Sequence, residues 1–314
     1  MENTNLHNTL IIVNPTAGDG QAKKRWQIFE KDLKNNKIPY HTEITESKNH
    51  ATEIVSNAVS SGYTRIGVFS GDGTLNEVLQ GLFKEDQIIS DDIKLIFFPG
   101  GSSCDFEKKF KNKKSIVDRI QSEDSIAIDI FKVECQDFSG KQISRYIINN
   151  SSIGIISLAN EKFNSVSGLT KKIKQMSIDA GAVICGLKAI TEFTPFSAEM
   201  RMDGENLSIQ NFSNITIFKT ANFGGDMSYG VETIQDDGLL SVVWLDGTSR
   251  LGLATLMPSL FTGTVLNKKL AHYKTCREFE LRTEDSVILE TDGESIGVPP
   301  LKYTILQKAL QVII

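Results

Sequence analysis

The sequence predicts an α/β domain with a parallel sheet, followed by a β-rich domain with a mostly antiparallel sheet. The first prediction rests on apolar strands that alternate with amphipathic helices up to about residue 129. The second rests on the short β-rich segments, separated by turn residues, that follow. We therefore expect two domains, residues 1–130 and 131–314, with the tail 300–314 packing back on the first.

The expected elements follow from hydrophobic periodicity and turn residues. In the first domain we expect strands at 9–13, 40–45, 66–69 and 94–98, and helices at 22–33, 51–60 and 75–82. In the second we expect strands at 125–134, 144–149, 197–202, 214–219, 239–245, 278–282 and 286–291, with one long helix at 170–191. The uncharged stretch 251–266 is too short and too polar to span a bilayer, so we expect a buried or interfacial helix.

Three glycine-bearing turns follow strands of the first domain, at 14–20, 70–74 and 99–106. Glycine lets the backbone approach a ligand, and a helix N-terminus offers unpaired N–H groups to an anion such as phosphate. In a parallel sheet these turns share one edge, where ligands of α/β folds bind. Asp72 would repel phosphate, so we assign it to a metal ion or a polar ligand edge. The alternative is an ordinary capped turn, since Asn76 replaces the third glycine of a G-x-G-x-x-G fingerprint.

Composition excludes several classes of protein. The 314 residues carry 34 basic and 39 acidic side chains, and a net charge of −5 argues against a nucleic-acid partner held by bulk electrostatics. The N-terminus lacks the pattern of a signal peptide, and no apolar run reaches the ~18 residues of a membrane span. Four widely spaced cysteines fit free thiols. We therefore expect a cytoplasmic protein.

The order of the motifs resembles the diacylglycerol kinase catalytic family, especially its soluble bacterial lipid kinases, and more distantly the sphingosine and ceramide kinases. Residues 14–18 look like the family's N-P-x-A/S-G, 70–77 like G-G-D-G-T-x-N-E, and 99–105 like P-x-G-T-x-N-D. The segments 149–154, 222–225, 237–238 and 292–294 then follow in the family's order. The resemblance implies a phosphofructokinase-like αβα nucleotide-binding domain and a β-sandwich-like second domain.

The resemblance also implies two cofactors, ATP and Mg²⁺, and assigns roles to particular residues. Nucleotide contacts are expected at Asn14, Pro15, Thr16, Ala17, Gly18, Thr45, Gly71, Asp72, Gly73, Thr74, Leu75, Asn76, Glu77 and Ser102. Asp72 and Asp105 would support the catalytic Mg²⁺, Asp129 would join that network, and Glu294 would act as general base.

A second, structural Mg²⁺ site is implied at Asp237 with the backbone carbonyls of Ile234 and Leu239. Plainer alternatives are a β-turn at Asp237 and a solvated hairpin acid at Glu294.

The sequence departs from the family at several motif positions. Ser70 replaces a glycine, and Ser102 replaces a threonine while keeping its hydroxyl. Cys104 replaces an asparagine, and a thiol cannot supply an amide's two donors and acceptor. Asp226 and Val231 replace a glycine and a proline, so the identity of the lipid stays open.

We thus expect an ATP-dependent lipid kinase that phosphorylates a hydroxyl of a diacylglycerol-like or sphingoid lipid, an activity of lipid metabolism, at the membrane surface. The lysine-rich run 108–114 would hold an anionic membrane in transient, peripheral association; the alternative is a solvated helix end. Two other functions remain, an NAD kinase-like enzyme and a degenerate homologue that binds lipid or nucleotide without turnover. Cys104 favours the second of these.

Overall fold

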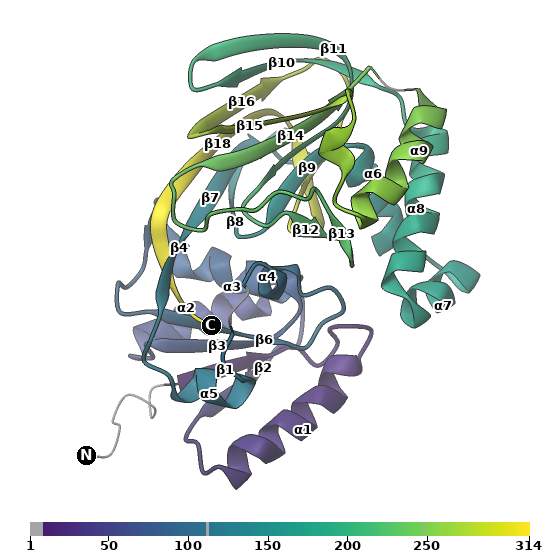
Figure 1. Ribbon diagram of the computed structural model, residues 1–314. Helices are drawn as coiled ribbons and strands as arrows, with labels where there is room; N and C mark the ends of the chain where they lie inside the picture. Colours follow the sequence, from purple (N-terminus) through teal and green to yellow (C-terminus); the bar gives the residue numbers. More distant parts are fainter. Residues whose placement is uncertain (1–8, 111–112, 248) are drawn as a thin grey trace. The chain divides into compact units, whose positions relative to one another are not determined.

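The computed structural model describes residues 9–110, 113–247 and 249–314, and the chain forms two compact units (Figure 1). Unit 1 ends at Ile130 and also contains Gln307–Ile314, whereas unit 2 is Phe131–Leu306. Two strands, β7 (Ile126–Gln136) and β18 (Glu294–Ile313), contribute residues to both units.

Unit 1 is a parallel sheet in the order β2–β1–β3–β6–β18. Its other strands are β1 (Thr9–Val13), β2 (His41–Ile44), β3 (Arg65–Ser70) and β6 (Lys94–Pro99), and β4 (Phe83–Lys84) pairs with β5 (Gln87–Ile88). Its helices are α1 (Gln21–Asn35), α2 (His50–Ser60), α3 (Asp72–Leu82), α4 (Asp105–Lys108) and α5 (Ile116–Gln121).

Helices cover both faces of this sheet, which explains why its strands β1 and β3 are buried along their whole length. Figure 1 shows α1 and α5 on one face and α2 and α3 on the other. Trp26 and Phe29 of α1 pack against Phe69 of β3, with ring centroids 5.2 and 5.5 Å from it. The predicted α/β fold of the first half is therefore confirmed.

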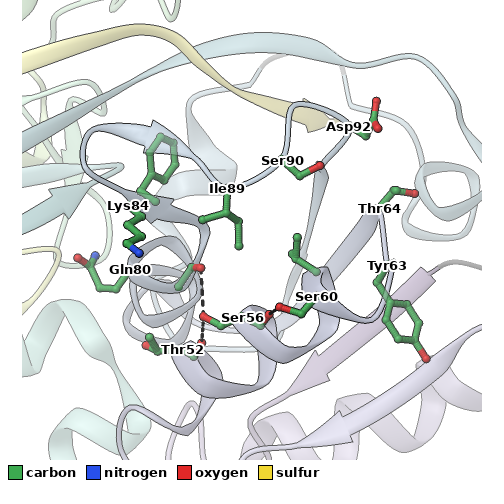
Figure 2. A pocket seen from close by; sticks show the side chains of 14 residues that line it. Thr52, Ser56, Ser60, Tyr63, Thr64, Gln80, Lys84, Ile89, Ser90 and Asp92 are labelled. Atoms are coloured by element: carbon green, nitrogen blue, oxygen red, sulfur yellow. Dashed lines mark hydrogen bonds between the residues drawn. The ribbon is translucent and has the colours of Figure 1, made fainter.

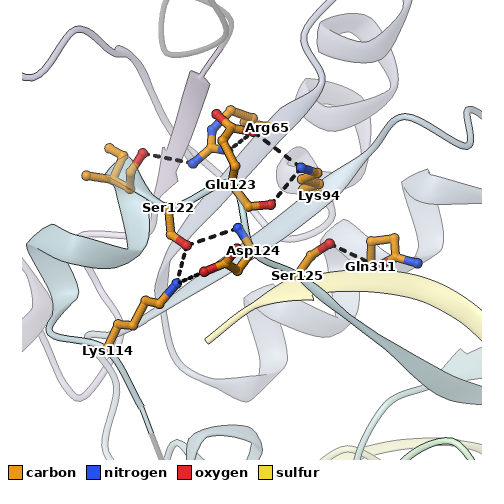
Figure 3. Close-up of polar contacts among 9 residues, drawn as sticks. Arg65, Lys94, Lys114, Ser122, Glu123, Asp124, Ser125 and Gln311 are labelled. Atoms are coloured by element: carbon orange, nitrogen blue, oxygen red, sulfur yellow. Dashed lines mark hydrogen bonds and ion pairs between the residues drawn. The ribbon is translucent and has the colours of Figure 1, made fainter. Parts of the chain in front are cut away.

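The end of the chain completes the sheet of unit 1. Gln311 pairs in parallel register with Lys94 of β6. Its side chain accepts a hydrogen bond from Ser125 Oγ at 3.0 Å (Figure 3). In the same view, the buried guanidinium of Arg65 donates to the carbonyl of Ile120 at 2.8 Å and lies 3.7 Å from Glu123. These contacts hold the edge where β3 and β6 begin.

Unit 2 is built around an antiparallel sheet in the order β15–β14–β11–β10–β16–β18. Strand β9 pairs with β11 and β17, β17 also pairs with β18, and β7 pairs with β8 and β18. The bounds are β8 (Gln142–Ile147), β9 (Asn150–Gly154), β10 (Phe196–Met202), β11 (Glu205–Phe218), β14 (Leu240–Asp246), β15 (Ala271–Cys276), β16 (Glu278–Arg282) and β17 (Leu289–Thr291). A ribbon of β12 (Asn222–Phe223) and β13 (Met227–Ser228) stands apart from this sheet.

The helices of unit 2 correct one prediction. The expected helix 170–191 is two helices, α7 (Gly168–Met176) and α8 (Ile178–Glu192), because Ser177 is extended and its hydroxyl accepts from the N–H of Ala180. The remaining helices are α6 (Ile155–Asn164), α9 (Arg250–Phe261) and the 3₁₀ helix η2 (Val265–Asn267).

Helix α9 occupies the uncharged stretch. It buries Leu253 and Leu256 and exposes Leu251. None of the helices in the described parts of the chain is long and apolar enough to cross a membrane.

Candidate active site

The register of the parallel sheet brings the three glycine turns to one edge. Val13 pairs with Ile44 of β2 and with Phe69 of β3, and Ser70 pairs with Pro99 of β6. The residues that follow these strands therefore leave the sheet side by side. The backbone N–H of Asn14 donates to the Phe69 carbonyl at 3.2 Å, and that of Thr45 donates to the Val13 carbonyl at 2.9 Å.

A pair of side chains joins the first turn to the second. Asn14 Nδ2 donates to Thr74 Oγ1 at 2.8 Å. The amide oxygen of Asn14 accepts from the N–H and the hydroxyl of Thr16 at 3.0 and 2.8 Å. Asn14 thereby fixes the turn between β1 and α1, where Pro15 and Ala17 also lie.

Glycines let the third turn pack against the other two. A Cβ on Gly101 would lie 2.4 Å from the Cα of Gly71, so only glycine fits there. Gly18 has a φ of +61°, and a Cβ there would lie 3.4 Å from Ser102 Oγ. Arg25 of α1 donates to the Gly101 carbonyl at 2.9 Å. The predicted nucleotide residues of all three turns are therefore neighbours.

The carboxylate of Asp72 holds the third turn to helix α3. Its Oδ2 accepts from the N–H of Asp105 at 2.9 Å, and its Oδ1 accepts from the N–H of Phe106 at 3.0 Å. Asp105 Oδ1 in turn accepts from Ser103 Oγ at 2.6 Å and from Lys108 Nζ at 2.9 Å. The two predicted Mg²⁺ ligands thus lie together, and both carboxylates accept hydrogen bonds.

Other predicted nucleotide residues differ in their surroundings. Leu75 and Asn76 are buried in helix α3, whereas Gly73 is exposed and a Cβ there would meet no atom within 4 Å. Glu77 Oε2 accepts from the N–H of Ala51 at 3.3 Å, so this carboxylate helps to cap α2.

Asp129 contacts the end of the chain. It is fully buried, and its Oδ1 accepts from the N–H of Lys308 at 2.8 Å. A buried carboxylate needs such donors, because an unpaired one is strongly destabilising. This contact ties β7 to β18 within unit 1.

Position 104 combines backbone strain with a buried thiol. Cys104 has a φ of +50°, in the left-handed region where asparagine is favoured among non-glycine residues. Burial raises the pKa of its thiol to about 12, with the Asp72 carboxylate acting in the same direction. Cys104 is therefore an uncharged, unreactive group in the third turn.

The predicted general base lies in unit 2, as the first residue of β18, directly after the turn that leads from β17. Glu294 follows Asp292 and Gly293, whose φ angles are +44° and +92°. Asp292 accepts from the N–H groups of Ile148, Asn149 and Asn150 at 3.0–3.1 Å, which fixes the turn. Glu294 Oε2 lies 3.6 Å from the guanidinium of Arg145, and its side chain is 32% exposed.

A second acid of this turn was missed by sequence reasoning. Glu290 is buried, and its Oε1 accepts from the N–H of Gly293 at 2.6 Å. Burial raises the pKa of this carboxyl to about 8, and Asp292 contributes to the rise. Glu290 lies in the short strand β17, whose sequence Leu-Glu-Thr carries no distinctive pattern, so no sequence signal marks it; none marks Arg145, the partner of Glu294, either.

The predicted structural Mg²⁺ ligands face a lysine. Lys219 Nζ donates to Asp237 Oδ1 at 2.8 Å and to the Leu239 carbonyl at 3.1 Å. The third predicted ligand, the carbonyl of Ile234, belongs to the same loop, and the side chain of Ile234 is 60% exposed.

Three lysines of the run 108–114 pair with acids outside the run. Lys108 pairs with Asp105, Lys113 with Glu107 at 3.4 Å and Lys114 with Asp124 at 2.7 Å. Lys109 Nζ lies 4.3 Å from the ring centroid of Phe106. Lys111 and Asn112 lie outside the described residues. The run therefore offers less unpaired charge than its sequence indicates.

A hollow of about 680 Å³ on unit 1 is separate from this site (Figure 2). Its lining includes Thr64, just before β3, and Asp92, shortly before β6. These residues precede the strands, whereas Asp72 and Ser102 follow them. Thr64 and Asp92 thus lie at the opposite edge of the sheet from the glycine turns, and the hollow extends from them along α2 and α3.

Comparisons with known proteins agree with this arrangement. Residues 8–133 match the model of the diacylglycerol kinase catalytic domain, and residues 152–314 match that of the YegS C-terminal NAD kinase beta sandwich-like domain.

Proteins that are similar over most of their length carry the same family name. A diacylglycerol kinase of Mycobacterium tuberculosis is 23% identical over 307 residues, covering 96% of this chain and 93% of its own. One of Staphylococcus carnosus is 24% identical, with the same two coverages. A diacylglycerol kinase structure from Bacillus anthracis superposes with a TM-score of 0.73 at 22% identity, covering 98% of this chain and 96% of that one. The chain therefore belongs to the diacylglycerol kinase catalytic family, and it is a kinase.

Proposed function

We propose that this kinase transfers the γ-phosphoryl group of ATP to a hydroxyl of a diacylglycerol-like or sphingoid lipid at a membrane surface. The observation that carries the proposal is the meeting of three glycine turns at the carboxyl edge of the parallel sheet, tied by Asn14, Thr74 and Asp72. Phosphoryl transfer depends mainly on positioning and charge stabilisation, and a fixed cradle of this kind suits both.

ATP fits the turns on chemical grounds. Gly71 and Gly101 leave backbone where side chains would otherwise project, and helix α3 begins at Asp72 with its N–H groups near the exposed Gly73. Such groups suit the phosphates of a nucleotide. The residues of the turn 14–18, with Thr45 and Ser102, would contact the rest of the nucleotide.

The site suits a Mg²⁺ ion that binds together with the nucleotide. Among the described residues, no group of three or more His, Cys, Asp or Glu side chains could hold a metal ion. Mg²⁺ at kinase sites usually takes one or two carboxylates together with phosphates and waters. Asp72 and Asp105 offer that number of carboxylates, and each oxygen has further lone pairs. When bound, the ion would neutralise charge on the transferred group.

Glu294 is the proposed acceptor of the hydroxyl proton. Asp292 and Glu290 fix the preceding turn through backbone hydrogen bonds, which leaves the partly exposed Glu294 side chain to meet a substrate. Asp129 stays a proposed member of the Mg²⁺ network, although its described contact is to Lys308. The names of the similar proteins support a lipid acceptor.

We further propose that the kinase acts from the cytoplasm by transient contact with an anionic membrane surface. Lipid substrates of this class reside in bilayers, and Lys109, Lys111 and their neighbours would add modest electrostatic attraction. Because several of these lysines pair with acids, the electrostatic share should be small.

The test is transfer of label from [γ-³²P]ATP, run in parallel with mixed lipid vesicles containing diacylglycerol and sphingosine, and with NAD. Label in the lipid fraction, absent in the Asp72→Asn variant, supports the proposal. Label in NADP instead supports the NAD kinase-like alternative. Nucleotide binding without transfer to either acceptor supports the degenerate alternative.

A further inference from the structure

The segment that precedes β14 is organised around a buried lysine. Lys219 directly follows β11, and its side chain is only 2% exposed. Lysine is rarely buried to this extent unless its charge is paired. Here the ammonium donates to Asp237 Oδ1 at 2.8 Å and to the Leu239 carbonyl at 3.1 Å. The ammonium group of Lys219 therefore supplies a positive charge inside this loop.

The two acceptors belong to two of the three residues, Ile234, Asp237 and Leu239, that the family resemblance assigns to a structural Mg²⁺. A divalent ion bound to Asp237 and to the Leu239 carbonyl would lie beside the ammonium, since both cations would share the same two oxygens. Like charges at that separation repel, and burial strengthens the repulsion. The residues present thus do not fit a Mg²⁺ ion here.

We propose that the Lys219 ammonium replaces the divalent cation in this loop, so that unit 2 keeps its structure without a metal. Mg²⁺ requires nearly octahedral oxygen coordination, whereas an ammonium needs only a few acceptors for its three donors. One carboxylate and one carbonyl supply most of that need.

Further contacts of Lys219 tie the loop to the rest of unit 2. Gln235 Nε2 donates to the Lys219 carbonyl at 3.0 Å, and the Lys219 N–H donates to the Asn149 carbonyl at 2.9 Å. Leu239 N–H donates to Asp237 Oδ1 at 3.0 Å, which closes the loop on the same carboxylate. Main chain and side chain of one residue therefore hold the segment.

The same chain of contacts leads to the turn of the proposed general base. Thr220 Oγ1 donates to Asn149 Oδ1 at 3.0 Å, and the Asn149 N–H donates to Asp292 Oδ1 at 3.0 Å. A fixed lysine at this place supports the turn permanently, whereas a metal would support it only when bound. In this protein the lysine thus takes the structural role, and Mg²⁺ keeps only its proposed role beside ATP.

The test compares melting temperatures without nucleotide, in excess EDTA and in millimolar Mg²⁺. For wild type we expect the melting temperatures in EDTA and in Mg²⁺ to agree within about 1 °C. Lys219→Ala should melt roughly 5 °C lower in EDTA, because Asp237 loses its partner, and should recover part of this loss in Mg²⁺. The double variant Lys219→Ala/Asp237→Asn should recover none of its melting temperature in Mg²⁺.

Lys132→Ala is the matched control, since Lys132 is 12% exposed and pairs with Glu134 at 3.0 Å. Its melting temperature should not respond to Mg²⁺.

Direct binding of Mn²⁺, followed by electron paramagnetic resonance, gives a second readout. Wild type and Asp237→Asn should bind equally, and Lys219→Ala should gain a site. The proposal is overturned if wild type melts several degrees lower in EDTA than in Mg²⁺, and if this difference in melting temperature is lost in Asp237→Asn but kept in Asp72→Asn. A Lys219→Ala variant without any response to Mg²⁺ or Mn²⁺ also counts against it. If that variant does not fold, the comparison of wild type with Asp237→Asn decides. None of these measurements depends on kinase activity, so the proposed function is tested separately.

Discussion

Two acid–glycine turns, Asp72-Gly73-Thr74 in unit 1 and Asp292-Gly293-Glu294 in unit 2, use their aspartates in the same way. Each carboxylate accepts backbone N–H groups from a segment distant in the sequence. Asp72 holds residues 105–106, and Asp292 holds residues 148–150. Their surroundings differ, because Asp292 is 7% exposed whereas Asp72 is only half-buried.

The difference indicates how each turn divides its work. In the second turn, buried Asp292 and Glu290 fix the backbone and leave the chemistry to Glu294. In the first turn, one partly exposed aspartate, Asp72, is assigned both roles: it fixes the backbone and takes part in the proposed chemistry. Substitution at Asp72 should therefore change activity and stability together, whereas substitutions in the second turn should separate them.

The largest effect is expected at Asp72. Asp72→Asn removes the charge beside the proposed Mg²⁺–ATP, and we expect kcat to fall by about a thousandfold or more. The amide keeps one acceptor for the N–H groups of Asp105 and Phe106, so we also expect a loss of about 1–2 kcal/mol in the free energy of unfolding. Lipid kinase assays and urea denaturation measure the two effects.

The matched control is Asp92→Asn at the opposite edge of the sheet (Figure 2). It should leave both activity and stability near the wild-type values. If Asp72→Asn retained more than about a tenth of the wild-type kcat, Asp72 would be only a structural tie and the comparison between the turns would lose its basis.

Glu294→Gln should separate activity from stability. The amide cannot take a proton from the acceptor hydroxyl, so kcat should fall by roughly two to four orders of magnitude while ATP binding is nearly unchanged. The Arg145 ion pair is partly exposed and contributes about 1 kcal/mol at most. Steady-state kinetics, ATP titration and thermal melting check these expectations; a normal kcat would exclude Glu294 as the base.

Sequence patterns predicted the fold and the meeting of the glycine turns, but not the partners of individual carboxylates. The strands of unit 1 are recognisable as apolar runs, and a parallel sheet must bring their ends together. By contrast, Asp72 meets an N–H group 33 residues away, and Asp292 meets one 142 residues away. Such contacts depend on loop paths that local periodicity does not encode.

The same reason explains other differences. Lys219 and Asp237 are 18 residues apart, and their pairing depends on how the loop before β14 folds back. Likewise, the break between α7 and α8 depends on one serine within an otherwise helical pattern.

Glu290→Gln should change the pH dependence of stability. Because the pKa of Glu290 is raised to about 8, the folded state keeps a proton that the unfolded chain releases near pH 4.5. The free energy of unfolding therefore falls as pH rises between these two pKa values, by a total of roughly 5 kcal/mol from this group, and is constant above them. The glutamine variant should lack that slope, which urea denaturation at several pH values measures. A variant with the wild-type slope would show that Glu290 is ionised in the folded state.

The smallest effect is expected at Cys104, the substitution that most favours a degenerate enzyme. The residue lies beside Asp72 in the third turn, but its thiol stays protonated at neutral pH and donates to the Ser70 carbonyl at 3.8 Å. Cys104→Asn restores the residue type of the family motif at a φ of +50°, where asparagine is favoured. We expect stability to change by less than about 1 kcal/mol and kcat by less than about threefold, because the backbone ties of Asp72 fix the turn with either side chain. If instead kcat rose by orders of magnitude, the amide would be part of the catalytic cradle, and the natural chain with its thiol would be the impaired relative that Cys104 suggests.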